Sequence, residues 1–279
     1  MLKNSQQVET YKNENPQQDK LAGGFIVQWQ NSVPSTNKLV KKDIVANLAQ
    51  KRCVHAAFEQ TAGYGRQGRT WVSPKGGLYA SFPEILSCDL REMPSFSLFV
   101  SLVIARVLRN AFGVDDAYIK WPNDIVCPQG KLCGISLELI NNTVCVGIGI
   151  NVFAPFKKIL VGGKYVPAYV AEKLQLANSF VAQEGLSSAQ KRYIQAMLNE
   201  IFREYQQLFP LWQQYGFSYF REEYISLTRL IDSFVEIENI ENQTVVEGVV
   251  LDIDNQGSIV IQQKDATKIS FSSGEIHLK

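Results

Sequence analysis

The chain has 279 residues, of which 46% are hydrophobic and 20% are charged. This composition is that of a folded globular protein and excludes a disordered or fibrous chain. The length exceeds that of a typical single domain, so we expect one large domain with a smaller companion. Lys and Arg number 28 against 27 for Asp and Glu, which excludes an overall charge that would attract nucleic acid or an anionic membrane. Any anion site must therefore be local.

The cysteines and the N-terminal residues indicate the compartment. The five cysteines are odd in number and contain no C-x-x-C pair, which argues against a disulfide framework or a zinc site and favours reduced thiols in the cytosol. The polar residues 1–24 lack the apolar core of a signal peptide, and no stretch reaches the roughly 18 uninterrupted apolar residues of a membrane span. We expect a cytoplasmic protein with a mobile polar tail over 1–24.

The first half of the chain predicts strands and helices separated by one long loop. Ser35-Thr36-Asn37 suits the start of a helix, and apolar residues on more than one face indicate that the next helix is largely buried. In chain order the predicted elements are a strand at 25–30, a helix from Ser35 to about Leu48, a β-prone segment at 52–58, a loop at 61–77, a short apolar run at 78–82 and a helix at 96–112.

The second half predicts the rest of a mixed sheet and then a separate β region. Short apolar strands are predicted at 117–121, 131–140 and 143–152, with Asn141-Asn142 as a turn, and helices at 187–205 and about 210–224. After Ile231 the pattern changes to short alternating strands at 233–240, 244–254, 257–263 and 268–271, which fits a small β-barrel-like domain. The predicted organisation is a tail over 1–24, a main domain over 25–231 and a C-terminal β domain over 232–279.

The segment Gln60–Pro74, here called the glycine-rich loop, carries the strongest chemical signal. Its glycines at 63, 65 and 68 let backbone N–H groups converge on an anion, while Arg66 and Arg69 add positive charge and forked donors. A phosphate or carboxylate is the expected ligand. On these residues alone, a flexible basic surface loop stays open as an alternative.

Two further motifs offer polar groups at the ends of strands. In IKWPNDI (119–125), Pro122 stiffens the turn that presents Asn123 and Asp124, although a structural turn would use the same residues. Lys131 precedes Gly134 in KLCGIS, and taken alone it would be a solvated lysine. GIGINV (147–152) lacks the full spacing of a dinucleotide-binding loop and is better interpreted as a buried strand.

The order of these motifs resembles the signature blocks of the biotin protein ligases. The matching blocks are SVPSTN, EQTAGYGRQGRTWVSP, IKWPND, KLCGISLE and VGIGINV, and the terminal SSGEIHL resembles the end of that family's small C-terminal domain. The resemblance covers roughly residues 25 to 279. It implies an α+β fold in which helices flank a mixed β-sheet, the class II synthetase-like biotin/lipoate ligase fold, followed by an SH3-like β-barrel.

The resemblance also implies an activity. With ATP and Mg²⁺ the enzyme would convert biotin to biotinyl-5'-AMP with release of pyrophosphate. It would then transfer biotin to a specific lysine of a biotin carboxyl carrier protein, from acetyl-CoA carboxylase or a related carboxylase. A homodimer stays open.

Residue roles carry over from the resemblance by position. Arg66, Lys131 and Asp124 would be catalytic. Arg66 would hold the phosphate, Lys131 would contact the reacting carboxylate and α-phosphate, and Asp124 would orient the acceptor amine or take its proton. The implied biotin pocket comprises Ser35, Thr36, Asn37, Gln60, Gly63, Tyr64, Gly65, Arg66, Lys131 and Gly134. The implied nucleotide site comprises Arg66, Arg69, Trp71, Asn123, Lys131 and Asn151.

One residue departs from the family pattern, because Tyr64 stands where the first arginine of a Gly-Arg-Gly-Arg run is expected. We hypothesise that Gly63 to Gly65 acts through backbone N–H groups while Tyr64 supplies an apolar face to a lid.

Three alternatives to this interpretation require other sequence features. A lipoate ligase would share the fold but lack this loop and the KWPND block. A DNA-binding repressor would need a further N-terminal domain, for which the 24 residues before the first strand are too few, so no specific DNA binding is expected. An inactive biotin-binding module would have lost Arg66, Asp124 or Lys131, all of which are present.

Overall fold

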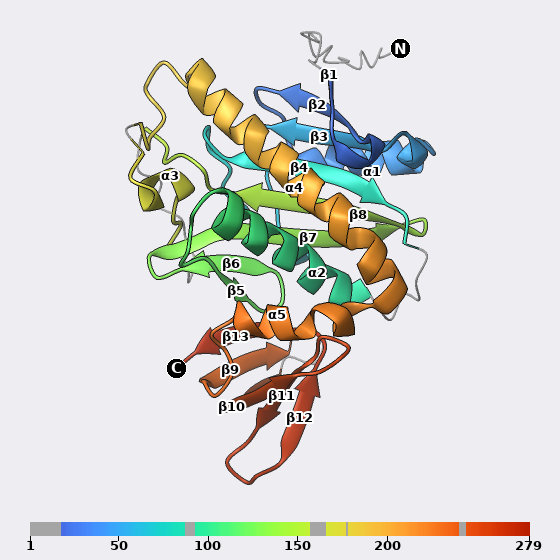
Figure 1. Cartoon of the computed structure of the whole chain (residues 1–279), viewed down its shortest axis with the longest axis vertical. Coiled ribbons are helices and arrows are strands. Elements are labelled where there is room, and N and C mark those ends of the chain that lie inside the picture. Colours follow the sequence, from blue (N-terminus) through green and yellow to red (C-terminus); the bar gives the residue numbers. More distant parts are fainter. Residues whose placement is uncertain (1–17, 87–92, 157–165, 177, 240–243) are drawn as a thin grey trace, which may run out of the picture.

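The computed structural model describes residues 18–86, 93–156, 166–176, 178–239 and 244–279, which form two β-sheets and the helices packed on them (Figure 1). The strands of the main sheet are β1 (Gln18–Lys20), β2 (Ile26–Gln30), β3 (Cys53–Ala57), β4 (Leu78–Glu84), β5 (Tyr118–Lys120), β6 (Asp124–Cys127), β7 (Gly130–Ile140) and β8 (Thr143–Ile150). The helices are α1 (Thr36–Val45), α2 (Met93–Arg106), α3 (Val170–Lys173), α4 (Ser188–Tyr215) and α5 (Arg221–Ser226). The C-terminal strands are β9 (Phe234–Asn239), β10 (Thr244–Ile253), β11 (Ile259–Gln262), β12 (Lys268–Phe271) and β13 (Glu275–Leu278).

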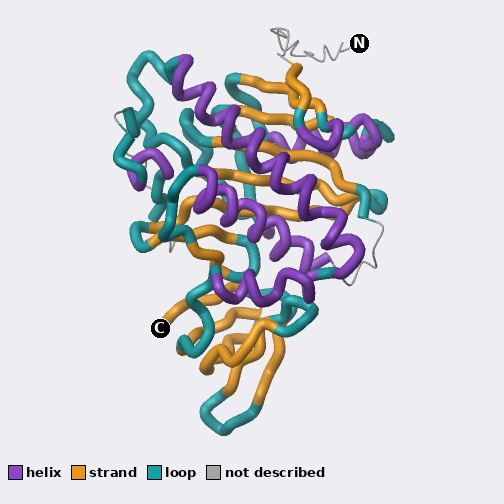
Figure 2. Tube along the Cα trace, in the orientation of Figure 1, coloured by secondary structure: helices purple, strands orange, loops and turns teal. Residues whose placement is uncertain are grey.

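The main sheet has eight strands in the order β1-β2-β3-β4-β8-β7-β6-β5. Only β2 and β3 run parallel, and the other neighbouring strands are antiparallel. Both β4 and β8 are buried along their whole length because helices cover both faces of the sheet. As Figures 1 and 2 show, α2 and α4 lie on one face, while α1 packs on β3, β4 and β8 from the other. Since side chains alternate along a strand, each central strand contributes to both layers.

Several predicted elements are confirmed. The strand at 25–30 is β2, the helix begins at Thr36, and the strands at 131–140 and 143–152 are β7 and β8. Asn141 and Asn142 both have positive φ angles, as a tight hairpin turn requires. The predicted helix at 96–112 is α2, which continues as a π-helical turn over Val107–Ala111.

Other expectations were wrong. The helix predicted at 187–205 continues through Pro210 to Tyr215 as the single helix α4. Proline removes one backbone hydrogen bond there, but the apolar stripe continues across it, and Leu208 and Trp212 remain buried. The helix predicted at about 210–224 is therefore divided between the end of α4, a 3-10 turn at Phe217–Phe220 and α5. The first helix ends at Val45, short of Leu48, and β6 was not expected. The predicted tail over 1–24 is wrong at its end, because Gln18–Lys20 pairs with β2. Residues 1–17 lie outside the described residues.

The C-terminal strands form a separate antiparallel sheet in the order β12-β11-β10-β9-β13, consistent with an SH3-like domain. The fold class is therefore a mixed sheet flanked by helices with a small C-terminal β domain, as expected. The indole N–H of Trp121 donates to the carbonyl of Gly257 at 3.0 Å. Residues 120–124, here called the KWPND segment, therefore pack directly on this domain. None of the described helices is long and apolar enough to cross a membrane.

Candidate functional site

One pocket of about 590 Å³ collects nearly all of the predicted site residues. It lies between the glycine-rich loop, the strands β7 and β8, the KWPND segment and the edge of the C-terminal sheet. The predicted residues that line it are Thr36, Asn37, Gln60, Tyr64, Gly65, Arg66, Arg69, Trp71, Asn123, Asp124, Lys131, Gly134 and Asn151. Ser35 and Gly63 do not line the pocket. Ser35 is the buried residue before α1, and a Cβ on Gly63 would lie 2.4 Å from the Ser73 hydroxyl, so Gly63 permits close packing of the loop.

Buried polar side chains form one end of the pocket at the start of α1. The first N–H groups of a helix have no partner within the helix, and here the backbone N–H of Thr36 donates to Gln60 Oε1 at 2.9 Å. The Gln60 amide donates in turn to the Ser73 hydroxyl at 3.0 Å, and Ser81 donates to the Thr36 hydroxyl at 2.7 Å. These contacts hold buried donors and acceptors in fixed positions, which suits the recognition of a polar group of a small ligand.

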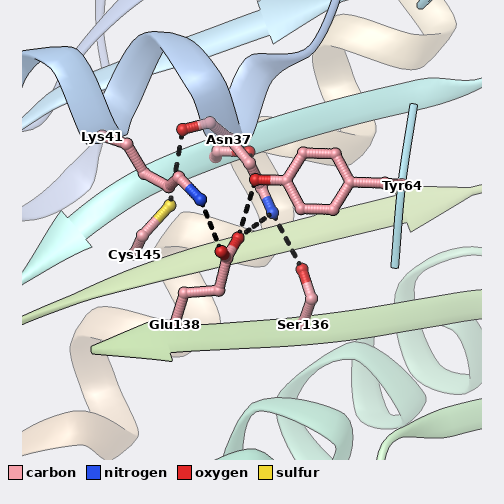
Figure 3. A network of polar contacts seen from close by, with 7 residues as sticks. Asn37, Lys41, Tyr64, Ser136, Glu138 and Cys145 are labelled. Carbon is pink, nitrogen blue, oxygen red and sulfur yellow. Dashed lines mark hydrogen bonds and ion pairs between the residues drawn. The ribbon is translucent and has the colours of Figure 1, made fainter. Parts of the chain in front are cut away.

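A second polar network joins this end of the pocket to the glycine-rich loop (Figure 3). Glu138 of β7 accepts from the Tyr64 hydroxyl at 2.9 Å and from the Asn37 amide at 3.1 Å. It also pairs with Lys41 Nζ at 2.6 Å, and this contact raises the pKa of Lys41. The Asn37 amide donates to Ser136 as well, at 3.0 Å. The hypothesis that Tyr64 supplies an apolar face did not include its hydroxyl, which hydrogen-bonds to Glu138 and so ties the loop to the sheet.

Three glycines of β7 and β8 lack the side chains that would otherwise collide with Trp71 or Asn37. Gly134 of β7 lies opposite Gly149 of β8, and a Cβ at Gly149 would lie 2.6 Å from the indole nitrogen of Trp71. A Cβ at Gly147 would lie 2.3 Å from Asn37 Oδ1. The motif read as a plain buried strand, GIGINV, is therefore buried as expected, and its glycines also leave room for Trp71 and Asn37. The indole N–H of Trp71 is buried without a hydrogen-bond partner among the described residues, so it can serve a ligand.

The other end of the pocket is charged. Lys131 Nζ lies 2.6 Å from Asp124 Oδ2, while Asp124 Oδ1 is buried and has no hydrogen-bond partner in the described part of the chain. Arg66 donates to Asn123 Oδ1 at 2.8 Å, and burial lowers the pKa of its guanidinium. A desolvated cation of this kind gains by contacting an anion, because the anion replaces the lost hydration.

Sequence reasoning missed three charged residues that line the pocket, namely Lys120, Glu238 and Glu275. Lys120 lines the pocket, and burial lowers its pKa to about 8. Glu275 of β13 also lines it and pairs with Arg69 at 2.6 Å; burial works against ionisation of Glu275, but Arg69 outweighs it and the pKa is lowered. The glycine-rich loop is thus joined to the C-terminal domain.

The charged end fits a magnesium ion accompanied by phosphates. Mg²⁺ in nucleotide sites is held by one or two carboxylates, substrate phosphates and waters. Asp124 supplies such a carboxylate, with one oxygen unused by the protein.

Family models match two segments of the chain. Residues 29–152 match the biotin/lipoate A/B protein ligase family, and residues 231–279 match the biotin protein ligase C terminal domain. The bifunctional ligase/repressor BirA of Escherichia coli (strain K12) is 29% identical over 255 residues, covering 88% of this chain and 72% of BirA. The biotin--[acetyl-CoA-carboxylase] ligase of Mycobacterium tuberculosis is 25% identical over 274 residues and covers 94% of each chain.

A solved structure shares the fold. The biotin protein ligase from Aquifex aeolicus, in complex with biotin and ATP, superposes with a TM-score of 0.71 at 22% identity, covering 91% of this chain and 98% of that one. The match of residues 29–152 places the main domain in the biotin/lipoate A/B protein ligase class. The match of residues 231–279 to the biotin protein ligase C terminal domain narrows this class, and the chain belongs to the biotin protein ligase family of enzymes.

Proposed function

We propose that this chain activates biotin as biotinyl-5'-AMP and transfers the biotinyl group to a lysine of a biotin carboxyl carrier protein. One observation carries the proposal: a single pocket joins a buried polar end at α1 to a charged end holding Arg66, Asp124 and Lys131. Biotin has a polar ring at one end and a carboxylate at the other, so its carboxylate would reach the charged end. ATP would lie beside it, with its adenine against Trp71.

In the first step, a biotin carboxylate oxygen attacks the α-phosphorus of ATP, and the bond to pyrophosphate breaks. Two anions must approach, so the site has to offset their repulsion and the charge that develops on the α-phosphate. Lys131 and the desolvated Arg66 supply that charge, with backbone N–H groups of the glycine-rich loop. Asp124 is the residue that would hold Mg²⁺, which would supply further positive charge at the phosphates.

In the second step, the lysine amine of the carrier attacks the acyl carbon of biotinyl-AMP, and AMP leaves. The amine must attack in its neutral form, and Asp124 Oδ1 can accept its proton. Biotinyl-AMP is a mixed anhydride that water hydrolyses, so it must be kept dry until the carrier arrives. The contacts of the loop with Glu138 on one side and Glu275 on the other are suited to holding the loop closed over it.

Adenylation can be tested without a carrier. Biotin, ATP and Mg²⁺ should yield pyrophosphate and enzyme-bound biotinyl-AMP in one turnover, identified by mass. Lys131→Ala should slow this turnover more than it weakens biotin binding measured by calorimetry, because the charge is needed most in the transition state. If biotin affinity collapses while bound biotin reacts at the normal rate, Lys131 acts only in substrate binding. If lipoate reacts and biotin does not, the substrate assignment is wrong.

A further inference from the structure

A second group of side chains with metal-binding chemistry lies outside the pocket. Asp43 is on α1, and Cys53 and His55 are on β3. Since residues two apart on a strand point to the same face, the thiol and the imidazole both face α1. One ring nitrogen of His55, the sulfur of Cys53 and a carboxylate oxygen of Asp43 lie within 4.8 Å of one another. None of the three lines the candidate active site.

The burial of these residues is that of an enclosed site with one open side. Cys53 and His55 are buried, whereas the Asp43 side chain is 27% exposed. His55 Nε2 lies 2.8 Å from Asp43 Oδ2. The other nitrogen, Nδ1, is buried and has no hydrogen-bond partner among the residues described. An ion pair between His55 and Asp43 accounts for His55 Nε2 and the Asp43 carboxylate. It leaves His55 Nδ1 and the Cys53 thiol without a role.

We infer that Asp43, Cys53 and His55 form a site for a zinc-like divalent ion that links α1 to β3. Thiolate and imidazole are ligands that Zn²⁺ prefers and Mg²⁺ does not. In a tetrahedral site with bonds of about 2.0 to 2.3 Å, ligand atoms are separated by roughly 3.3 to 3.7 Å. The three groups therefore need to move by only about 1 Å, and a water entering beside Asp43 would complete the coordination.

Charge balance supports the same ion. Coordination would displace the proton of the Cys53 thiol into solvent, and the resulting thiolate and the Asp43 carboxylate would contribute two negative charges that a divalent cation neutralises. Such a neutral assembly is far less costly to bury than an unpaired charge. The absence of C-x-x-C pairs argued against a zinc site, but that argument concerned sites built from paired cysteines. Here the fold brings Asp43 of helix α1 next to Cys53 and His55, which both lie on strand β3.

Occupancy would stiffen the base of the candidate biotin site. Asp43 lies on the helix that begins with Thr36 and Asn37, and His55 is paired across the sheet with Ser81. Ser81 donates to Thr36, so the ion would join the two elements that hold this polar network. The inference does not depend on the proposed activity, and its test measures metal binding alone.

The test uses Co²⁺ as a coloured substitute for Zn²⁺. The full chain, stripped with a chelator, is titrated with Co²⁺, and thiolate coordination is recognised by its charge-transfer absorption in the near ultraviolet. One equivalent should give this absorption, Zn²⁺ should displace it, and Mg²⁺ should not. Cys53→Ser should abolish it and weaken Zn²⁺ binding at least about a hundredfold, because even changes to residues around metal ligands cost ten- to a hundredfold.

The control is Cys127→Ser, which alters another buried cysteine and should leave the signal unchanged. Asp43→Asn, an isosteric change at a partly exposed position, should weaken Zn²⁺ binding and keeps the test decisive if Cys53→Ser does not fold. Zn²⁺ should also raise the Tm of the wild type, and raise it less in Asp43→Asn. The inference is overturned if the wild type shows no thiolate–cobalt absorption, or if Cys53→Ser keeps it.

Discussion

Replacing Tyr64 by Phe removes a single oxygen atom from the glycine-rich loop. We expect the Tyr64→Phe enzyme to release biotinyl-AMP faster than the wild type. The hydroxyl of Tyr64 donates to Glu138 at 2.9 Å, and a hydrogen bond to a charged group contributes about 1.5 to 3 kcal/mol. The Glu138 side chain is 30% exposed and keeps its contacts with Lys41 and Asn37. The loss should therefore be near the lower value, about 1.5 kcal/mol, which is roughly tenfold in dissociation rate.

The assay follows the dissociation of purified biotinyl-AMP from each variant after dilution into excess unlabelled ligand. Tyr215→Phe is a matched control, because Tyr215 is 49% exposed on α4, and it should leave the rate unchanged. Tyr64→Arg should be mild, since a guanidinium can also donate to Glu138. Equal rates for wild type and Tyr64→Phe would refute the view that this hydroxyl holds the loop closed.

Three further predictions concern the charged end and the floor of the pocket. Arg66→Ala should accelerate biotinyl-AMP release about ten- to a hundredfold, whereas Arg69→Ala, whose side chain is 52% exposed, should change it less than about fivefold; equal effects would contradict this division. Gly149→Ala should weaken ATP binding more than biotin binding, and Gly147→Ala should do the reverse, because the new methyl groups would meet Trp71 and Asn37 respectively; calorimetry with each ligand distinguishes the two. The pKa of Lys120 is lowered to about 8 by burial, so the free enzyme holds it mostly neutral above that pH. Bound polyphosphate favours the charged amine of Lys120, so ATP binding at about pH 9 should be accompanied by proton uptake. Calorimetry in buffers of different ionisation enthalpy measures this uptake. If proton uptake persists in Lys120→Met, another group is responsible for it.

The sequence predicted those parts of the site that lie in contiguous motifs. The glycine-rich loop and the KWPND segment each combine residue types that can act together over a few positions. Lys131, in contrast, is indicated only because its block KLCGISLE resembles a block of the family. Glu138 and Ser81 are different, because each lies within a mainly apolar strand and belongs to no local motif. The only signal for Glu138 was a charge within an apolar run. Glu275 lies about two hundred residues from Arg69, a separation that no local pattern spans.

The fold was predicted best where periodicity and turn residues agree. The Asn141-Asn142 turn and the strands beside it follow from local chemistry. The unbroken α4 does not, because the local rule for Pro210 favours a break, while burial of the stripe through Trp212 favours continuity and prevails. Strand β1 has only three residues, too few for any periodic pattern, and it is held in place by its pairing with β2.

The most direct test of the proposed activity is the mass of a carrier. A biotin carboxyl carrier domain is incubated with the protein, ATP, Mg²⁺ and an equal mixture of biotin and lipoate, and its mass is then measured. We expect the carrier to gain one biotinyl group on its acceptor lysine, with no gain when ATP is omitted. An unchanged carrier, or one that gains a lipoyl group instead, would contradict the proposal.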